Sequence, residues 1–212
     1  MIDPKILAAD REAALRITPV SRETSERLDR FVAHLLKWQS AVQLVAPSTL
    51  SKIWTRHIAD SLQLLPDIAS AKEVVDVGTG GGFPGLVLAV ASADKNFHLI
   101  ESDTRKSSFL REALRVTETA AEVYAERVES VAKRISTGIH MVTARAFAPL
   151  PRMLELTEPF FREGAKAAFL KSQDIDDELT TAAKSWIVNF QLRTSQTDPR
   201  GRILLIDQAK RR

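Results

Sequence analysis

The sequence predicts an α/β fold in which a mainly parallel β-sheet carries helices on both faces. Apolar runs of strand length alternate with helical patterns from residue 73 to residue 184, and this alternation is typical of parallel sheets. The glycine-rich segment 78–82 follows the first of these runs, as in strand–turn–helix units that bind nucleotide-like ligands. Two later apolar runs, joined by the turn-forming residues 198–201, favour an antiparallel hairpin at the end of the chain.

The chain is expected to form one globular unit with two parts. Its 212 residues are 44% hydrophobic and 27% charged, as in an ordinary soluble domain. We assign residues 1–66 to an N-terminal helical extension and residues 67–212 to a ligand-binding core that packs with it. No apolar stretch approaches the roughly 20 residues of a membrane span, and the first residues lack a signal-peptide pattern, so we expect a cytoplasmic protein without membrane contact.

Composition also narrows the chemistry. The chain has no cysteine, which excludes disulfides, zinc–thiolate sites and a cysteine nucleophile, and we expect no metal site. The formal net charge of +3 permits binding to a polyanion but does not require it.

The extension is predicted to contain two helices. Ser21 is a suitable N-cap for the first, which runs to about residue 40 and carries apolar side chains at helical spacing: Leu28, Phe31, Val32, Leu35 and Leu36. The second spans about residues 50–65 and ends before Pro66, which cannot continue a helix.

The core is predicted to alternate strands and helices. The expected strands are residues 73–77, 97–101, 121–125, 139–144 and 166–170, with a final hairpin formed by residues 187–192 and 203–206. The expected helices begin at about residue 84 and then span residues 104–116, 128–135, 149–161 and 175–184.

The glycine segment permits more than one interpretation. Residues 76–82 follow the pattern acid-x-Gly-x-Gly-x-Gly, which resembles the first motif of S-adenosylmethionine-dependent methyltransferases. Residues 80–85 also fit the dinucleotide pattern Gly-x-Gly-x-x-Gly, with Glu101 as the ribose-binding acid, and a purely structural glycine turn is the third alternative. The Asp76 carboxylate favours the first, because it would repel a pyrophosphate but suits ammonium and sulfonium charges.

Other candidate residues follow the ends of the predicted strands, where ligands bind on such sheets. Glu101 offers two acceptor oxygens for ribose hydroxyls, although it can equally be a solvated acid. Val128 and Glu129 can flank an adenine, although Glu129 also suits the first turn of a helix. Arg145 can hold a carboxylate, a base edge or a phosphate, or be an ordinary surface arginine.

Two absences limit the methyl acceptor. Methylation of a pyrimidine at carbon 5 needs a covalent nucleophile, normally cysteine, and is therefore excluded. Methylases of adenine amines carry Asn or Asp followed by two prolines and an aromatic after the fourth strand, whereas residues 143–148 read Thr-Ala-Arg-Ala-Phe-Ala. This class of methylase is therefore disfavoured. A ring nitrogen with a free lone pair needs no general base, so positioning can supply most of the rate.

Several segments occur together and in order: Trp38 after Leu35-Leu36-Lys37, His57-Ile58-Ala59-Asp60-Ser61-Leu62, the glycine segment followed by Phe83-Pro84-Gly85, Arg127-Val128-Glu129, Ala144-Arg145-Ala146-Phe147-Ala148 and Leu170-Lys171. From about residue 25 to residue 206 the sequence resembles the bacterial 16S ribosomal RNA guanine-N7 methyltransferase family, also called glucose-inhibited division protein B. The resemblance implies a class I, Rossmann-like methyltransferase fold and S-adenosylmethionine as cofactor. It also implies methyl transfer to N7 of a guanine in 16S rRNA, free or within the 30S particle, and we expect a monomer.

The resemblance also implies site residues. Cofactor contacts are expected from Asp76, Gly78, Gly80, Phe83, Glu101, Val128, Glu129 and Arg145. RNA contacts are expected from Asp60, Ser61, Arg127, Lys171 and Arg202. Substrate positioning, without a general base, is expected from Lys171, Arg145 and His57.

Some of these assignments keep alternatives. His57, Asp60 and Ser61 lie one helical turn apart and are expected to share a face, where they can close over the cofactor, receive RNA or form a buried packing network. Two segments depart from the family pattern, Gln43-Leu44-Val45 in place of Asn-Leu-Thr and Ser172 in place of glycine. A methyltransferase for a small molecule and a non-catalytic ribosome-binding protein remain the alternative functions.

Overall fold

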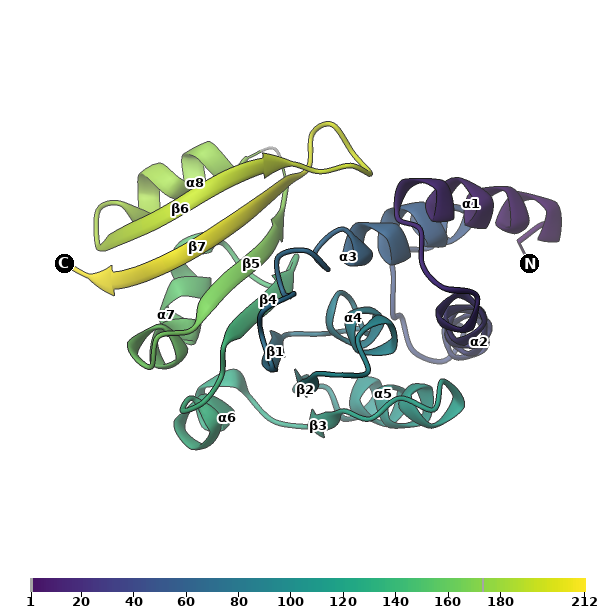
Figure 1. Ribbon diagram of the computed structural model, residues 1–212, viewed down its shortest axis with the longest axis horizontal. Helices are drawn as coiled ribbons and strands as arrows, with labels where there is room; N and C mark the ends of the chain where they lie inside the picture. Colours follow the sequence, from purple (N-terminus) through teal and green to yellow (C-terminus); the bar gives the residue numbers. More distant parts are fainter. Residues whose placement is uncertain (1, 173) are drawn as a thin grey trace.

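The computed structural model describes residues 2–172 and 174–212, which form a seven-stranded sheet of order β3-β2-β1-β4-β5-β7-β6 (Figure 1). The strands are β1 (Glu73–Val77), β2 (Asn96–Ile100), β3 (Glu122–Tyr124), β4 (Met141–Arg145), β5 (Lys166–Lys171), β6 (Trp186–Thr194) and β7 (Arg202–Arg211). Each predicted strand is present, within a few residues of its expected bounds.

Helices cover both faces of this sheet, as predicted. On one face lie α2 (Arg22–Trp38), α4 (Gly85–Ala91) and α5 (Thr104–Val116), and on the other lie α6 (Val128–Ile135), α7 (Leu150–Arg162) and α8 (Ile175–Ala182). None of the helices in the described part of the chain is both long and apolar enough to cross a membrane.

The strand order reverses at the centre of the sheet. β1 pairs in parallel with β2 on one side and with β4 on the other. The connections that follow β1 and β4 therefore run toward opposite edges of the sheet. A crevice therefore opens beyond the carboxyl ends of β1 and β4, where open sheets of this kind bind ligands. β7 pairs antiparallel with both β5 and β6, which is the predicted closing hairpin.

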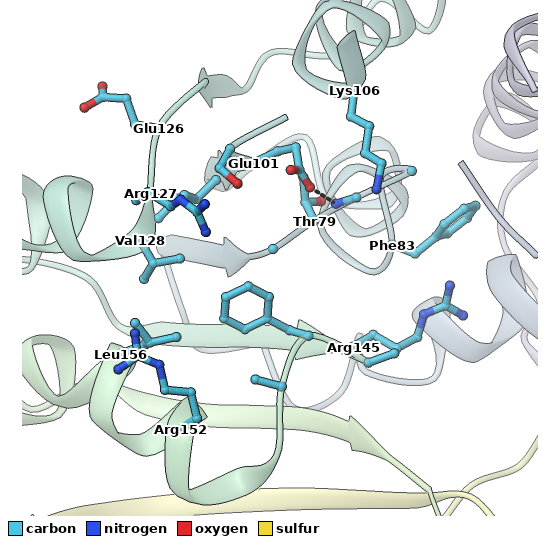
Figure 2. A pocket seen from close by; sticks show the side chains of 18 of the residues that line it. Thr79, Phe83, Glu101, Lys106, Glu126, Arg127, Val128, Arg145, Arg152 and Leu156 are labelled. Carbon is cyan, nitrogen blue, oxygen red and sulfur yellow. Dashed lines mark hydrogen bonds between the residues drawn. The ribbon is translucent and has the colours of Figure 1, made fainter. Parts of the chain in front are cut away.

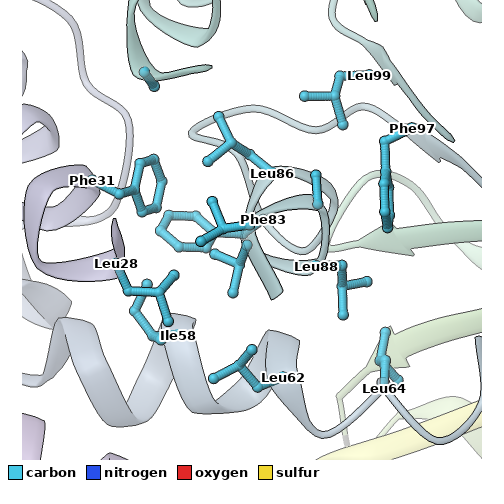
Figure 3. Close-up of a cluster of buried hydrophobic side chains, with 14 of the residues drawn as sticks. Leu28, Phe31, Ile58, Leu62, Leu64, Phe83, Leu86, Leu88, Phe97 and Leu99 are labelled. Atoms are coloured by element: carbon cyan, nitrogen blue, oxygen red, sulfur yellow. The ribbon is translucent and has the colours of Figure 1, made fainter. Parts of the chain in front are cut away.

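The N-terminal helices share a hydrophobic core with one face of the sheet (Figure 3). Leu28 and Phe31 of α2 are fully buried against the segment that follows the glycine turn, and the rings of Phe31 and Phe83 lie 5.5 Å apart in an edge-on arrangement. Ser21 caps α2 as predicted, since its hydroxyl accepts a hydrogen bond from the Thr24 amide.

Two features of the extension differ from the sequence-based expectation. A further helix, α1 (Pro4–Ile17), was not predicted from its weak apolar pattern. The second predicted helix is instead three short segments of different winding, η1 (Pro47–Lys52), the π-helix η2 (Trp54–Ala59) and α3 (Asp60–Leu62). Asp10 of α1 explains part of this, because its carboxylate accepts hydrogen bonds from the Trp54 and Thr55 amides at the start of η2.

Candidate functional site

The glycine turn after β1 is built on backbone angles that favour glycine. Gly78, Gly80 and Gly82 have φ values of +67°, +56° and +92°, in the left-handed region that side chains with a Cβ rarely adopt. A Cβ on Gly78 would lie 2.0 Å from Cδ2 of Phe147, so the ring packs directly on this residue. The turn thus brings bare backbone to the crevice at Gly78 and Gly80, the residues predicted to contact the cofactor.

Asp76 does not face the crevice, which corrects the prediction that it contacts the cofactor. Its side chain is fully buried, and its oxygens accept hydrogen bonds from the Thr143 hydroxyl at 2.7 Å and the Gly85 amide at 2.9 Å. Burial raises the pKa of this carboxyl to about 6. Asp76 therefore ties β1 to β4 and to the start of α4, and it shapes the turn from behind.

Glu101, at the end of β2, points toward the turn (Figure 2). One of its oxygens accepts a hydrogen bond from the Gly80 amide at 3.0 Å, and the other accepts one from the Asp103 amide at 2.8 Å. These bonds fix the orientation of the carboxylate. Each oxygen keeps a second lone pair, so the side chain can still accept hydrogen bonds from two hydroxyl groups of a ligand.

A first cavity of about 510 Å³ lies over the glycine turn. Gly78, Gly80, Phe83, Glu101, Val128, Glu129 and Arg145, all predicted cofactor residues, contribute to its lining. Glu129 is exposed and forms an ion pair of 2.7 Å with Arg152, whereas the Val128 side chain is buried and apolar. Arg127 lines this cavity too, away from the other residues predicted to bind RNA.

The segment that departs from the family pattern packs against the same turn. The Gln39 side chain accepts hydrogen bonds from the Leu44 and Val45 amides and donates one to the Val45 carbonyl. Leu44 lines the first cavity, and a Cβ on Gly81 would lie 2.9 Å from the Leu44 carbonyl oxygen. The contact is made by the backbone and Cβ of Leu44, the residue that this segment shares with the family pattern.

A second cavity of about 700 Å³ adjoins the first. It lies between the end of β4, the end of β5, η2 and the turn before β7, and it contains His57, Asp60, Lys171 and Arg202 among its lining residues. Among the described residues, the two cavities share only residues 145–148. This segment therefore forms the wall between the two cavities, and a group transferred from one cavity to the other would pass beside it.

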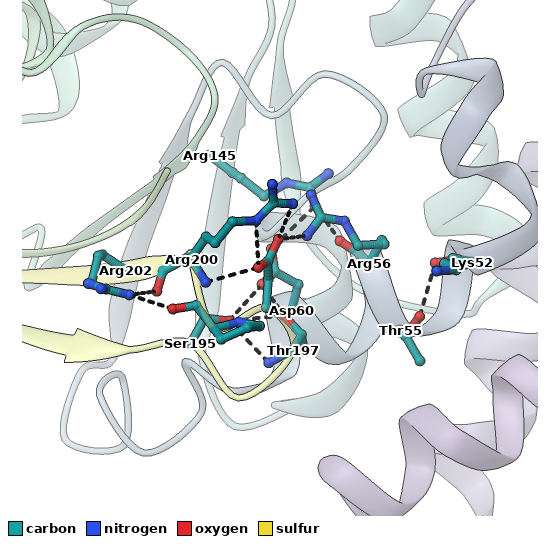
Figure 4. A network of polar contacts seen from close by, with 12 residues as sticks. Lys52, Thr55, Arg56, Asp60, Arg145, Ser195, Thr197, Arg200 and Arg202 are labelled. Atoms are coloured by element: carbon teal, nitrogen blue, oxygen red, sulfur yellow. Dashed lines mark hydrogen bonds and ion pairs between the residues drawn. The ribbon is translucent and has the colours of Figure 1, made fainter. Parts of the chain in front are cut away.

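Arg145 joins the two cavities through a polar network (Figure 4). Its guanidinium donates hydrogen bonds to the Arg56 carbonyl at 2.9 Å and to Nδ1 of His57 at 2.5 Å, and it lies 3.5 Å from a carboxylate oxygen of Asp60. It also lies 5.0 Å above the Phe83 ring, a cation–π distance. Burial lowers the pKa of the guanidinium, while the Asp60 charge opposes that shift.

His57 is held as a neutral ring. Burial, followed by the charges of Arg145 and Arg56, lowers the pKa of His57 to about 3. Because Arg145 can only donate, Nδ1 of His57 must accept, and the ring proton resides on Nε2, which lies 2.9 Å from the Thr49 hydroxyl. His57 is thus an anchor for Arg145 and not a proton donor near neutral pH.

Of the three alternatives stated for His57, Asp60 and Ser61, the buried packing network matches the contacts of Ser61. Asp60 lines the second cavity, where one oxygen accepts hydrogen bonds from Thr197 at 2.6 Å and Gln63 at 2.8 Å. Ser61 is fully buried, and its hydroxyl donates to the His57 carbonyl at 2.7 Å. The prediction that Ser61 contacts RNA is therefore wrong for this structure, because no surface of its side chain is accessible.

Lys171 and Arg202, both predicted to contact RNA, line the second cavity, but only the charge of Lys171 is paired with a carboxylate. Nζ of Lys171 lies 2.6 Å from a carboxylate oxygen of Glu178, and the Lys171 side chain is only 7% exposed. Arg202 donates hydrogen bonds to the Pro199 and Gly201 carbonyls. Lys171 is thus part of an ion pair that forms the cavity wall.

Several residues that line the second cavity were not predicted as site residues, among them Phe147, Glu178 and Asp198. Phe147 follows Arg145 by two positions at a strand end, and this placement could have indicated it. Glu178 lies within a helix and Asp198 within a turn, and nothing local in the sequence distinguishes them from surface acids. Asp198 forms an ion pair of 2.6 Å with Arg56.

Comparison with known proteins agrees with this geometry. A model of the family described as "GidB: rRNA small subunit methyltransferase G" matches residues 24–202, well over half of the chain. The chain belongs to this family. Because the family is one of methyltransferases, its membership confirms S-adenosylmethionine as the predicted cofactor.

Relatives with the same description match over nearly their whole length. Ribosomal RNA small subunit methyltransferase G of Bradyrhizobium sp. (strain BTAi1) is 49% identical over 214 residues, spanning 100% of this chain and 96% of that protein. The protein of the same name from Rhodopseudomonas palustris (strain BisB18) is 50% identical over 204 residues, spanning 95% of this chain and 87% of that protein.

A solved structure shows the same fold at low sequence identity. The O-methyltransferase from Bacillus cereus, described in complex with SAH, has a TM-score of 0.62 and 12% identity, with 96% of this chain and 99% of that chain covered. This likeness confirms the predicted class I methyltransferase fold.

Proposed function

We propose that this protein transfers a methyl group from S-adenosylmethionine to N7 of a guanine in 16S rRNA. The observation that carries the proposal is the pair of adjoining cavities that share residues 145–148, in a chain of this methyltransferase family. The first cavity suits a cofactor and the second suits a base, since both volumes lie within the range of small-ligand sites.

The residues of the first cavity fit an adenosyl ligand. The positive-φ glycines leave backbone exposed, Glu101 has free lone pairs for ribose hydroxyls, and Val128 offers an apolar side chain for adenine. When bound, S-adenosylmethionine supplies an electrophilic methyl group on a sulfonium. The lone pair of guanine N7 can form the new N–C bond while the S–C electron pair returns to sulfur, and no proton is lost.

The residues of the second cavity suit a reaction without a general base. His57 is neutral and both of its nitrogens are engaged, and Lys171 is paired with Glu178. Positive charge moves from the sulfonium to the methylated guanine, and the carboxylates of Asp60 and Glu178 line the cavity where that charge develops. In this proposal, the chain accelerates the reaction by orienting the two reactants.

The substrate, assembly and location belong to the same proposal. Arg56, Arg200 and Arg202 are among the lining residues of the second cavity and are suited to RNA phosphates. RNA affinity should then fall as salt rises, because phosphate contacts release counterions. We propose a cytoplasmic monomer that acts on 16S rRNA or the 30S particle, and light scattering during gel filtration checks the oligomeric state.

The test is methyl transfer from isotopically labelled S-adenosylmethionine. The acceptors are 16S rRNA and 30S particles from cells lacking this activity, and mass mapping identifies the labelled nucleoside. Label on N7 of one guanine supports the proposal. Label in a small molecule, unaffected by ribonuclease, would favour the small-molecule alternative, and absence of cofactor binding would favour a non-catalytic ribosome-binding protein.

A further inference from the structure

The wall between the two cavities contains one large side chain that takes no part in the polar network, although it packs against the apolar core on one face of the sheet. Arg145 is bound to η2, and Ala146 and Ala148 have only methyl side chains. Phe147 lines both cavities and is half-buried. Among the described residues lining the second cavity, Phe147 is the one phenylalanine, tyrosine or tryptophan.

The backbone directs this ring away from Arg145. Ala146 adopts a φ of +48°, a left-handed conformation that is unusual for a residue with a side chain. The strand therefore ends abruptly after Arg145, whose guanidinium turns toward His57, while the Phe147 ring packs on Gly78. Such local backbone strain often accompanies functional segments. Here it directs the side chains of Arg145 and Phe147 away from each other.

In this structure, the Phe147 ring occupies the surface that the cofactor is proposed to use. A Cβ on Gly78 would lie 2.0 Å from Cδ2 of Phe147, so the ring touches the glycine backbone. A ligand that binds on Gly78 would meet the ring and must displace it. Phe147 also lines the second cavity, so a displaced ring would have that space to enter.

From this placement we propose that Phe147 stacks on the target guanine in the second cavity once the cofactor has taken its place at Gly78. This inference rests on the proposed function. The N7 lone pair lies in the plane of the purine, so the base must present its edge, not its face, to the methyl group. Stacking fixes that plane, and an aromatic ring stacks on any base without sequence-specific hydrogen bonds.

Three substitutions of Phe147 separate stacking from packing. Phe147→Ala removes the ring, Phe147→Leu keeps apolar bulk without a π-face, and Phe147→Tyr keeps the ring. Phe190→Ala is the matched control, because Phe190 lies on β6, is 39% exposed and lines neither cavity. Circular dichroism melts establish that each variant is folded.

Two quantities are measured for each variant, the Kd for S-adenosylhomocysteine by calorimetry and the kinetics of methyl transfer to 30S particles. We expect Phe147→Ala and Phe147→Leu to lose about 10- to 100-fold in kcat/KM, the range expected when one stacked base loses its aromatic partner. Phe147→Tyr should recover most of that loss, and the Phe190→Ala control should transfer methyl groups as the wild type does. Phe147→Ala should bind S-adenosylhomocysteine at least as tightly as the wild type, because no ring has to be displaced.

Two results would overturn the inference. One is a Phe147→Leu variant as active as the wild type, which would make the ring a packing residue. The other is a Phe147→Ala variant whose cofactor affinity falls as far as its activity, which would place the ring in the cofactor site. If the wild type itself fails to label guanine N7, the proposed function fails and this inference fails with it.

Discussion

At the scale of single residues, the site depends on a few ionisable side chains whose surroundings change their usual protonation or solvation. His57 would ordinarily titrate near neutral pH, but burial and Arg145 keep it neutral. Asp76 would ordinarily be solvated, but it is enclosed between β1, β4 and α4. Both residues therefore organise backbone and neighbouring side chains, and neither presents a free charge to a ligand.

Replacing Gly78 by alanine should abolish cofactor binding. The new Cβ would occupy the surface that the cofactor is proposed to use, on a residue whose positive φ disfavours alanine, and in the free protein it would overlap the Phe147 ring. Gly138→Ala is the control, because Gly138 also has a positive φ of +87° but nothing lies within 4 Å of an added Cβ. Each variant should lose about 1–2 kcal/mol of stability from the backbone strain alone.

Calorimetry with S-adenosylhomocysteine and urea unfolding distinguish these two effects. We expect Gly138→Ala to bind normally at reduced stability, and Gly78→Ala to be less stable still and not to bind. Equal affinities in the two variants would contradict the position of Gly78 at the cofactor.

Replacing His57 by glutamine should change how stability depends on pH. The folded-state pKa of about 3 lies below the ordinary value of 6.5. Between these two pH values the ring is therefore protonated in the unfolded chain and neutral in the folded protein. The contribution of His57 is complete above pH 6.5 and is lost as the pH falls toward 3. Between about pH 7 and about pH 5, the wild type should lose about 2 kcal/mol relative to the variant.

Urea unfolding at both pH values measures this difference, with His140→Gln as the control because His140 is exposed. A difference between wild type and His57→Gln that stays constant with pH would show that the ring is not held neutral.

At the scale of elements, the ends of strands and helices bring distant side chains together. Glu178 of α8 pairs with Lys171 at the end of β5, and the same carboxylate oxygen accepts a hydrogen bond from the Leu150 amide at the start of α7. Since Pro149 gives α7 no side-chain cap, Glu178 satisfies one of the free amides of that helix from another element. One carboxylate therefore holds three elements at the second cavity.

Replacing Glu178 by glutamine should destabilise the protein by about 1–3 kcal/mol, because the Lys171 charge would remain in a partly buried wall without its partner. Glu26→Gln is the control, since its ion pair with Arg22 on α2 is exposed to solvent and should contribute little to stability. Chemical unfolding measures both. Equal losses would indicate that the Lys171–Glu178 pair is no stronger than a surface pair.

At the scale of the whole molecule, the helical extension and the sheet are joined by one apolar core. Leu28 and Phe31 of α2 pack with Leu86 of α4 (Figure 3). Phe109 of α5 belongs to the same core, and all four side chains are fully buried. Both cavities also depend on the extension, because Leu44 lines the first and His57 lines the second. The predicted division into residues 1–66 and 67–212 remains a prediction. Because the two parts share one core, it is tested by asking whether the second part folds alone.

A fragment of residues 67–212 should not fold stably by itself. Without α2, the apolar faces of α4 and α5 would be exposed to water, at a cost of about 25 cal/mol for each Å². Circular dichroism should show no cooperative thermal transition for the fragment, in contrast to a chain that lacks only residues 1–3. A cooperative transition of normal midpoint would instead establish two independent domains.

The sequence alone determined the features that depend on near neighbours along the chain. Hydrophobic periodicity located every strand and most helices, the capping residue Ser21 marked the start of α2, and the glycine pattern located the turn and its acid Glu101. These features were predictable because their physical causes lie within a few residues. Helix α1 and the irregular winding of residues 47–62 were missed, because contacts such as that of Asp10 with the Trp54 amide stabilise them across the fold.

Only the tertiary structure decided which side chains face a ligand. It buried Asp76 and Ser61, brought Arg145 to His57 across 88 positions of sequence, and paired Lys171 with Glu178. It also separated the predicted residues into two cavities with one shared wall. The physical reason is that exposure, charge pairing and pKa depend on every group packed nearby, and these groups come from segments that the spacing of residues cannot relate.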